Sequence, residues 1–118
     1  MAKVNLNVDV NRACESLGRQ VNDQTIGRER ATQLISEHFR HAFPKYNVMV
    51  VHSQHLTSFE DSVHTHIEIK TSFFGTTGFE VYIFKRGFFT LLGDGGFQNW
   101  CFSGNFKRDG SKVTFYDL

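Results

Sequence analysis

Apolar side chains recur at two different spacings along this chain. Between residues 25 and 43 they return every three or four positions, which is the spacing of a helix with one buried side. The apolar stripe consists of Ala31, Leu34, Ile35, His38, Phe39, Ala42 and Phe43. Thr25 is a suitable N-cap, Pro44 cannot continue the helix, and Ser36 falls on the polar side. The pattern predicts one long amphipathic helix that must pack against another layer.

The N-terminal part of the chain has a weaker pattern. Apolar residues at positions 4, 6, 8 and 10 alternate with polar ones, as in a half-buried strand or an extended arm. Asn11 is then expected to cap a short helix. The apolar side of that helix would hold Val10, Cys14, Leu17 and Val21.

From Tyr46 onward the spacing changes to two, which is the spacing of strands. The predicted strands cover residues 46–56, 63–72, 78–85, 88–92, 97–106 and 112–117. The connections are short and rich in turn residues, so neighbouring strands are expected to form antiparallel hairpins. Residues 1–118 are therefore predicted to form a single α+β domain, in which the long helix packs on a curved antiparallel meander of five to six strands.

One long helix followed by an antiparallel meander resembles the cystatin-like and related cone-shaped folds in outline. The resemblance stops short of the inhibitory motifs. The first hairpin after the helix has no Gln-x-Val-x-Gly, and no later hairpin has Pro-Trp. The resemblance therefore implies a shape and does not imply protease inhibition.

Composition excludes several classes of protein. Thirteen basic and twelve acidic residues give a net charge of +1, and no basic stripe is visible, so nucleic acid is not expected as a partner. No apolar stretch approaches the roughly 20 residues that cross a bilayer, and the N-terminus does not resemble a signal peptide. These features favour a cytoplasmic protein without membrane contact. In that compartment Cys14 and Cys101 are expected to be free thiols.

Three histidines form the first candidate site. His64 and His66 project from the same face of one strand. If residues 46–56 and 63–72 pair as a hairpin, with apolar sides matched, His55 lies opposite His64 and Ser53 lies opposite His66. Three imidazoles on one polar face are a ligand set for a zinc-like ion, and Glu68 would be a nearby carboxylate. A solvated strand face that happens to use histidine is the competing interpretation.

The second candidate site is the aromatic segment that follows Leu92. Its alternation places Trp100, Phe102 and Phe106 on one side of a strand, and most of these rings are expected in the core. The glycine-rich loop and the strand also offer short amide and carboxylate groups beside aromatic rings, a combination that binds sugars and other polar ring compounds. The predicted ligand-binding residues are Asp94, Phe97, Gln98, Asn99, Trp100 and Asn105.

Phe73 and Phe74 are adjacent at a predicted turn, so a single core layer cannot bury both. A partner chain, most simply a second copy in a homodimer, would cover one of them. The sequence thus favours a non-enzymatic binding module for a small polar ligand, with a glycan as one example, or for a protein partner. A metal-dependent enzyme centred on His55, His64 and His66 and a dimeric structural or inhibitory protein are the alternatives.

Overall fold

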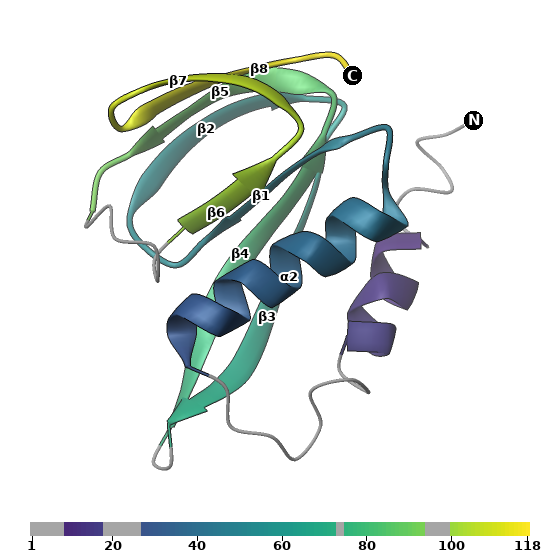
Figure 1. Cartoon of the computed structure of the whole chain (residues 1–118), viewed down its shortest axis with the longest axis vertical. Helices are drawn as coiled ribbons and strands as arrows, with labels where there is room; N and C mark the ends of the chain where they lie inside the picture. The colour runs from purple at the N-terminus through teal and green to yellow at the C-terminus, as the bar shows by residue number, and fades with distance from the viewer. Residues whose placement is uncertain (1–8, 18–26, 73–74, 94–99) are drawn as a thin grey trace.

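Three layers make up the structure (Figure 1). The computed structural model describes residues 9–17, 27–72, 75–93 and 100–118, which form two helices and eight strands. The first helix covers residues 9–17. The other elements are α2 (Arg28–Ala42), β1 (Asn47–Val51), β2 (His55–Glu60), β3 (Val63–Ser72), β4 (Gly75–Phe84), β5 (Arg86–Leu91), β6 (Trp100–Ser103), β7 (Asn105–Asp109) and β8 (Lys112–Tyr116). The predicted α+β class and the antiparallel pairing are confirmed.

The predicted single meander of five to six strands is wrong, because the strands form two sheets of four. Sheet A has the order β3-β4-β1-β6, and sheet B has the order β2-β5-β8-β7. Both helices pack on one face of sheet A, and sheet B covers part of the other face. The fold is therefore a two-sheet sandwich with helices on one side, and it is not the cone-like outline expected from the sequence.

The extra strands arise where a predicted strand turns a corner between the sheets. The predicted strand 46–56 becomes β1 in sheet A and β2 in sheet B, with residues 52–54 between them. The predicted strand 97–106 is divided at Gly104 into β6 and β7. A pattern of period two continues through such corners, because alternation records which side faces the core and not which sheet the strand joins.

Asn47 holds one of these corners together. Its side chain is completely buried, and its Nδ2 donates to the carbonyl oxygens of Lys85 at 2.8 Å and Tyr116 at 3.0 Å. Its Oδ1 accepts from the backbone N–H of Asn105 at 2.8 Å. Gly104 has a φ of +131°, and a Cβ there would lie 2.0 Å from the Asn47 Oδ1. Only glycine fits beside this amide, so the corner depends on the pair.

The helices follow the predicted spacing with three corrections. The N-cap of α2 is Gly27, and Thr25 lies outside the described residues. The first helix begins ahead of Asn11, so Val10 is a buried helical residue and not the end of a strand. Ser36, expected on the polar side of α2, is buried and hydrogen-bonds Cys101 on β6. Neither helix in the described ranges has the length and apolar character that a membrane span needs.

Two apolar clusters stabilise the layers. The first lies between the helices and sheet A, with Ile35 and Phe39 of α2 against Val48, Val50 and other strand residues. The second lies between the sheets and is mainly aromatic. Its members and close neighbours are Met49, Val51, Phe59, Tyr82, Phe84, Phe89, Leu91, Trp100, Phe102, Val113 and Phe115. Most of the aromatic content of the chain is thus accounted for by a core, as the alternation predicted.

The two cysteines lie over opposite edges of sheet A. Cys14 Sγ is 3.7 Å from the Thr65 Oγ1 on β3, while Cys101 is on β6. These strands are three strand spacings apart in sheet A, roughly 14 Å, and a disulfide needs Cα atoms within about 7 Å. The two thiols therefore cannot pair with each other in this fold.

Candidate functional site

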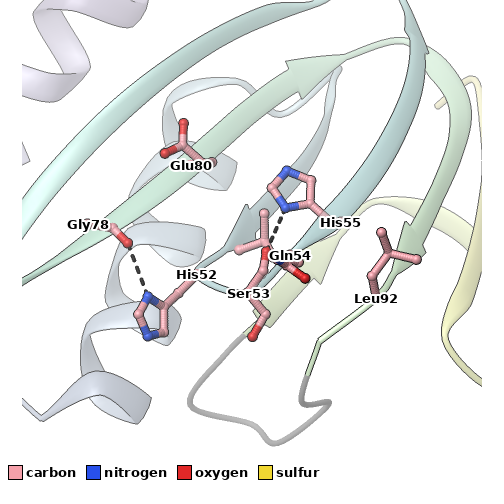
Figure 2. Close-up of a pocket in the computed structure, with 8 residues that line it drawn as sticks. His52, Ser53, Gln54, His55, Gly78, Glu80 and Leu92 are labelled. Atoms are coloured by element: carbon pink, nitrogen blue, oxygen red, sulfur yellow. Dashed lines mark hydrogen bonds between the residues drawn. The ribbon is translucent and has the colours of Figure 1, made fainter.

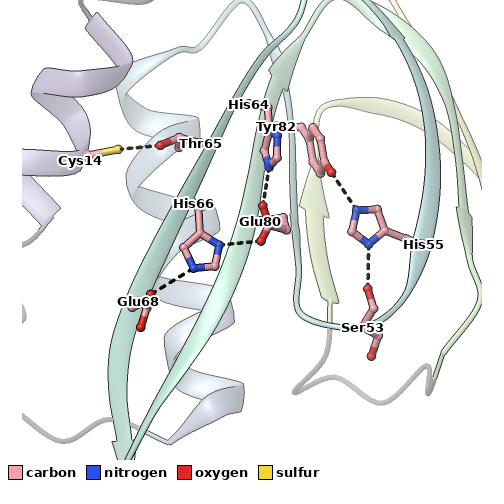
Figure 3. Close-up of polar contacts among 9 residues, drawn as sticks. All are labelled: Cys14, Ser53, His55, His64, Thr65, His66, Glu68, Glu80 and Tyr82. Carbon is pink, nitrogen blue, oxygen red and sulfur yellow. Dashed lines mark hydrogen bonds and ion pairs between the residues drawn. The ribbon is translucent and has the colours of Figure 1, made fainter.

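A row of polar side chains crosses β3 and β4 on the face of sheet A that points away from the helices (Figure 3). The register pairs His64 with Tyr82 and His66 with Glu80. The expected hairpin between residues 46–56 and 63–72 is wrong, since β1 pairs with β4 and β6, and β2 pairs with β5. His55 is therefore not the cross-strand neighbour of His64, and Ser53 is not that of His66.

The centre of the row is the Glu80 carboxylate. It accepts a hydrogen bond from Nε2 of His64 and another, at 2.6 Å, from Nδ1 of His66. Burial alone would raise the pKa of Glu80, but the hydrogen bonds and the charges of the two imidazoles together outweigh it and lower that pKa. The hydrogen bond to Glu80 raises the pKa of His66. Glu80 is thus a carboxylate that stays charged although its side chain is only 30% exposed.

Gly78 makes room for this arrangement. A Cβ at Gly78 would lie 2.6 Å from the Cε1 of the His66 ring, so a larger residue would displace the imidazole. The other ring nitrogen of His66, Nε2, lies 3.4 Å from Oε2 of Glu68. Both nitrogens of His66 therefore face carboxylates, an environment that favours the protonated ring.

His55 joins the row from sheet B. Its Nδ1 lies 2.7 Å from the Ser53 carbonyl oxygen, which can only accept, so Nδ1 carries a hydrogen. In the neutral ring Nε2 then accepts from the Tyr82 hydroxyl at 2.8 Å. Burial, followed by the charge of Glu80, raises the pKa of Tyr82, so its hydroxyl keeps its proton. The Tyr82 ring also stacks on His64 at 4.5 Å, so Tyr82 contacts His64 within sheet A and His55 of sheet B.

Beside this row, the layer between the sheets opens into a pocket of about 610 Å³ (Figure 2). Glu80 and His55 border it together with the turn that carries Ser53 and Gln54, and with Leu92. His52 also borders it, and its Nδ1 lies 3.3 Å from the Gly78 carbonyl oxygen. The lining combines polar side chains with Val51 and Leu92, in contrast to the mainly aromatic cluster that fills the rest of the layer.

The predicted zinc ligands do not meet at one point. His64 and His66 both bind Glu80, and the Tyr82 ring lies between His64 and His55. In the described parts of the chain, no three His, Cys, Asp or Glu side chains form a group that could hold a metal ion. The zinc hypothesis for His55, His64 and His66 stays a prediction, now without the register on which it was based.

The predicted ligand-binding residues are divided. Trp100 is 5% exposed and packs in the aromatic cluster, with its ring near Phe89, Phe102 and the Arg108 guanidinium. Asn105 is exposed on β7, and its side chain donates to the Asp117 carbonyl oxygen at 2.9 Å. Asp94, Phe97, Gln98 and Asn99 lie outside the described residues, as do Phe73 and Phe74 of the predicted interface.

Sequence reasoning missed Glu80 and Tyr82. The other side of the same strand carries Phe79, Val81 and Ile83. The alternation of side chains therefore places Glu80 and Tyr82 on the face opposite this apolar one, and that is the signal in the sequence that could have identified them. The predicted hairpin between strands 63–72 and 78–85 is confirmed, but only its register shows that His66 lies opposite Glu80. A glycine inside a strand, here Gly78, indicates that another group packs closely against the backbone on that face.

The fold and site define an α+β sandwich with a polar pocket at the open end of its inter-sheet layer. Neither the models of protein families nor the solved structures give a match. Among curated proteins, the stress response protein YvgO of Bacillus subtilis (strain 168) is 30% identical to this chain over 118 aligned positions. The match covers 96% of this chain and 69% of the relative. The chain belongs to the family of this stress response protein.

Proposed function

We propose that this protein is a binding module that holds a small polar ligand in the pocket between the two sheets. The observation that carries the proposal is the charged and half-buried Glu80 at the border of a pocket of about 610 Å³. A carboxylate kept charged in a partly enclosed space is costly unless it has partners, and two imidazoles supply them here. A ligand with hydroxyl groups would use the remaining acceptor capacity.

The lining matches a compound with several hydroxyl groups, such as a monosaccharide. Glu80 and the Gly78 carbonyl oxygen accept hydrogen bonds, and the amide of Gln54 both donates and accepts. A hydroxyl group can donate to the acceptors and accept from the donors of this lining, whereas an anion would be repelled by the negative charge of Glu80. The pocket volume lies within the usual range for small-ligand sites, roughly 300–1,000 Å³.

The described ends of the glycine-rich segment adjoin this pocket. The backbone N–H groups of Leu92 and Gly93 donate to the Gln54 carbonyl oxygen at 2.8 and 3.1 Å. At the other end Trp100 pairs with Val51, which also lines the pocket. This placement supports the ligand-binding hypothesis for residues 94–99, whereas Trp100 itself is a buried member of the aromatic cluster.

Isothermal titration calorimetry against a panel of monosaccharides and other polyols tests the proposal. We expect binding that weakens about tenfold or more in Glu80→Gln, which leaves the shape of the pocket but removes the charge-assisted acceptor. Glu15→Gln, on the exposed side of the first helix, is the matched control and should bind like the wild type. Binding that is indifferent to Glu80→Gln and to His55→Ala would refute this site.

Elemental analysis of the purified protein separates this function from the zinc enzyme. A stoichiometric transition metal that is lost in His64→Ala would replace the binding module with a metal site at the histidines. Metal-free protein that binds a polyol would support the proposal made here. Light scattering over a range of concentrations tests the homodimer alternative in the same preparation.

A further inference from the structure

A second hollow lies on the outer face of sheet B, the face turned away from sheet A. Its volume is about 390 Å³. Phe88 of β5 stands in this face between Ser58 of β2 and Thr114 of β8, its cross-strand neighbours. Tyr116, two residues after Thr114, projects to the same side and also lines the hollow.

The two aromatic rings are unusually open. Phe88 is 62% exposed and Tyr116 is 49% exposed, although the inward residues of the same strands, Phe89 and Phe115, are buried. Single exposed aromatic residues are common on protein surfaces. Here two of them line one hollow of a size that fits a small molecule, and both remain largely accessible to solvent.

The polar side of the hollow is an arginine with two carboxylates. The Arg86 guanidinium donates to Asp117 in bidentate fashion, at 2.7 and 3.1 Å, and its Nη1 lies 3.4 Å from Oε1 of Glu60. One positive and two negative groups leave a net charge of −1 in the lining. Asp61, at the corner before β3, adds a further negative charge that acts on Arg86. Lys107 lies one strand away, opposite Thr114 on the edge strand β7.

The exposed aromatic rings and the net negative charge of the lining favour a positively charged ligand over a negatively charged one. The guanidinium is already engaged by carboxylates, so an anionic ligand would find no free cation in the lining and would be repelled by the net charge. A cation gains from both features, because aromatic faces and carboxylates each attract positive charge. An alkylated ammonium group also buries methyl groups against the rings.

We propose that the hollow bounded by Phe88, Tyr116 and the Glu60–Arg86–Asp117 triad binds a small organic cation with an alkylated ammonium group. The site goes beyond the function proposed above, because it lies on the opposite face of sheet B from the inter-sheet pocket and uses different residues. The two proposals can therefore fail independently.

Nuclear magnetic resonance titration with choline and with 3,3-dimethyl-1-butanol tests the role of charge directly. The alcohol has nearly the shape of choline, with a carbon atom in place of the charged nitrogen. We expect choline to shift the amide resonances of Gly87, Phe88 and Thr114, and the alcohol at the same concentration to leave them unchanged. Equal shifts with both compounds, or shifts with neither, would overturn the proposal.

Variants locate the site. Phe88→Leu keeps apolar bulk but removes the ring face, and Glu60→Gln removes one negative charge, so each should weaken choline binding about fivefold. Leu56→Ala is the matched control, because Leu56 is an exposed residue on the same face that pairs with Thr90, outside the hollow. Circular dichroism checks that each variant is folded. Choline binding that survives both site variants would place the cation elsewhere and overturn the proposal.

An ammonium group of this kind occurs in free small molecules and in lipid headgroups. Sedimentation with phosphatidylcholine vesicles distinguishes the two sources. Binding of free choline without sedimentation assigns the hollow to a soluble cation. Sedimentation that is lost in Phe88→Leu and Glu60→Gln assigns it to the headgroup, with the same recognition chemistry.

Discussion

The two ends of the layer between the sheets are built from different chemistry, and β1 reaches both of them. β1 begins at Asn47, in a corner closed by hydrogen bonds from the Asn47 side chain to backbone carbonyl oxygens and by the stacked rings of Phe59 and Phe84, whose centroids are 3.7 Å apart. It ends at Val51, beside the pocket that Glu80 and His55 border. One end is filled and the other is open and polar.

This difference indicates that the closed end contributes to the stability of the fold and that the open end is available for ligand binding. At the closed end the Asn47 amide is hydrogen-bonded to three backbone groups of the chain, and aromatic rings fill the space beside it. At the open end the polar groups border a space that a ligand can enter. Changes at the closed end should therefore unfold the protein, whereas changes at the open end should alter binding and pH dependence with small effects on folding.

The largest expected effect is that of Gly104→Ala. The new Cβ would strain a backbone with φ of +131° and would collide with the Asn47 amide, so it disrupts both members of the corner. We expect a loss of about 4 kcal/mol in the free energy of unfolding, measured with urea. Gly110→Ala is the control, because Gly110 has φ of +62° with nothing within 4 Å, and it should cost about 1 kcal/mol. Equal losses in the two variants would show that the corner is not tightly packed.

Asn47→Ala should have the next largest effect. It leaves two carbonyl oxygens and one N–H group without their partner in a buried corner. The expected loss is about 3 kcal/mol in the same urea experiment. Asn105→Ala removes one hydrogen bond from an exposed amide and should cost about 1 kcal/mol or less. An Asn47→Ala protein as stable as Asn105→Ala would move the stabilising role away from this corner.

The sequence predicted local structure at both ends, and its short connections predicted the hairpins β3–β4 and β7–β8, but it did not predict the partners of β1 and β2. The bounds 63–72 match β3, and the alternation placed Trp100 and Phe102 toward the aromatic cluster. Alternation follows from the burial of one face, which each strand records by itself. The partner of a strand depends on contacts distant in sequence, such as β1 with β4 and β6, and a local pattern does not contain that information.

The Asn47 corner and the candidate site at Glu80 show the same limit of prediction from sequence. Asn47 reads as an ordinary polar residue at the start of a strand, because its partners at 85, 105 and 116 are distant in the chain. The sequence showed the histidines but did not single out Glu80, since the contacts of Glu80 with His64 and His66 depend on the register between β3 and β4. Residue types that carry chemistry can be found from sequence, while their convergence requires the register.

The smallest expected effect concerns the open end and depends on pH. A histidine whose pKa is raised by folding stabilises the native state below its ordinary pKa of 6.5, and this contribution is lost as the pH rises through the native value. A glutamate whose pKa is lowered contributes above its ordinary 4.5, and loses that contribution as the pH falls through the native value. The contact of His66 with Glu80 should therefore stabilise the fold most between these two ordinary values.

Thermal unfolding of the wild type and Glu80→Gln at several pH values measures this window. The His66 side chain is 49% exposed and that of Glu80 is 30% exposed, so solvent partly screens the pair. We expect Glu80→Gln to cost about 0.5 to 1 kcal/mol near pH ~5.5, and less near pH ~8.5. Glu15→Gln, in the first helix, should show no such window. If the cost of Glu80→Gln is the same at every pH, the imidazoles do not hold the carboxylate in solution, and the open end loses the charged group on which its proposed ligand depends. A window at the expected pH, together with the large losses at Gly104 and Asn47, would establish that the two ends of one layer serve different purposes.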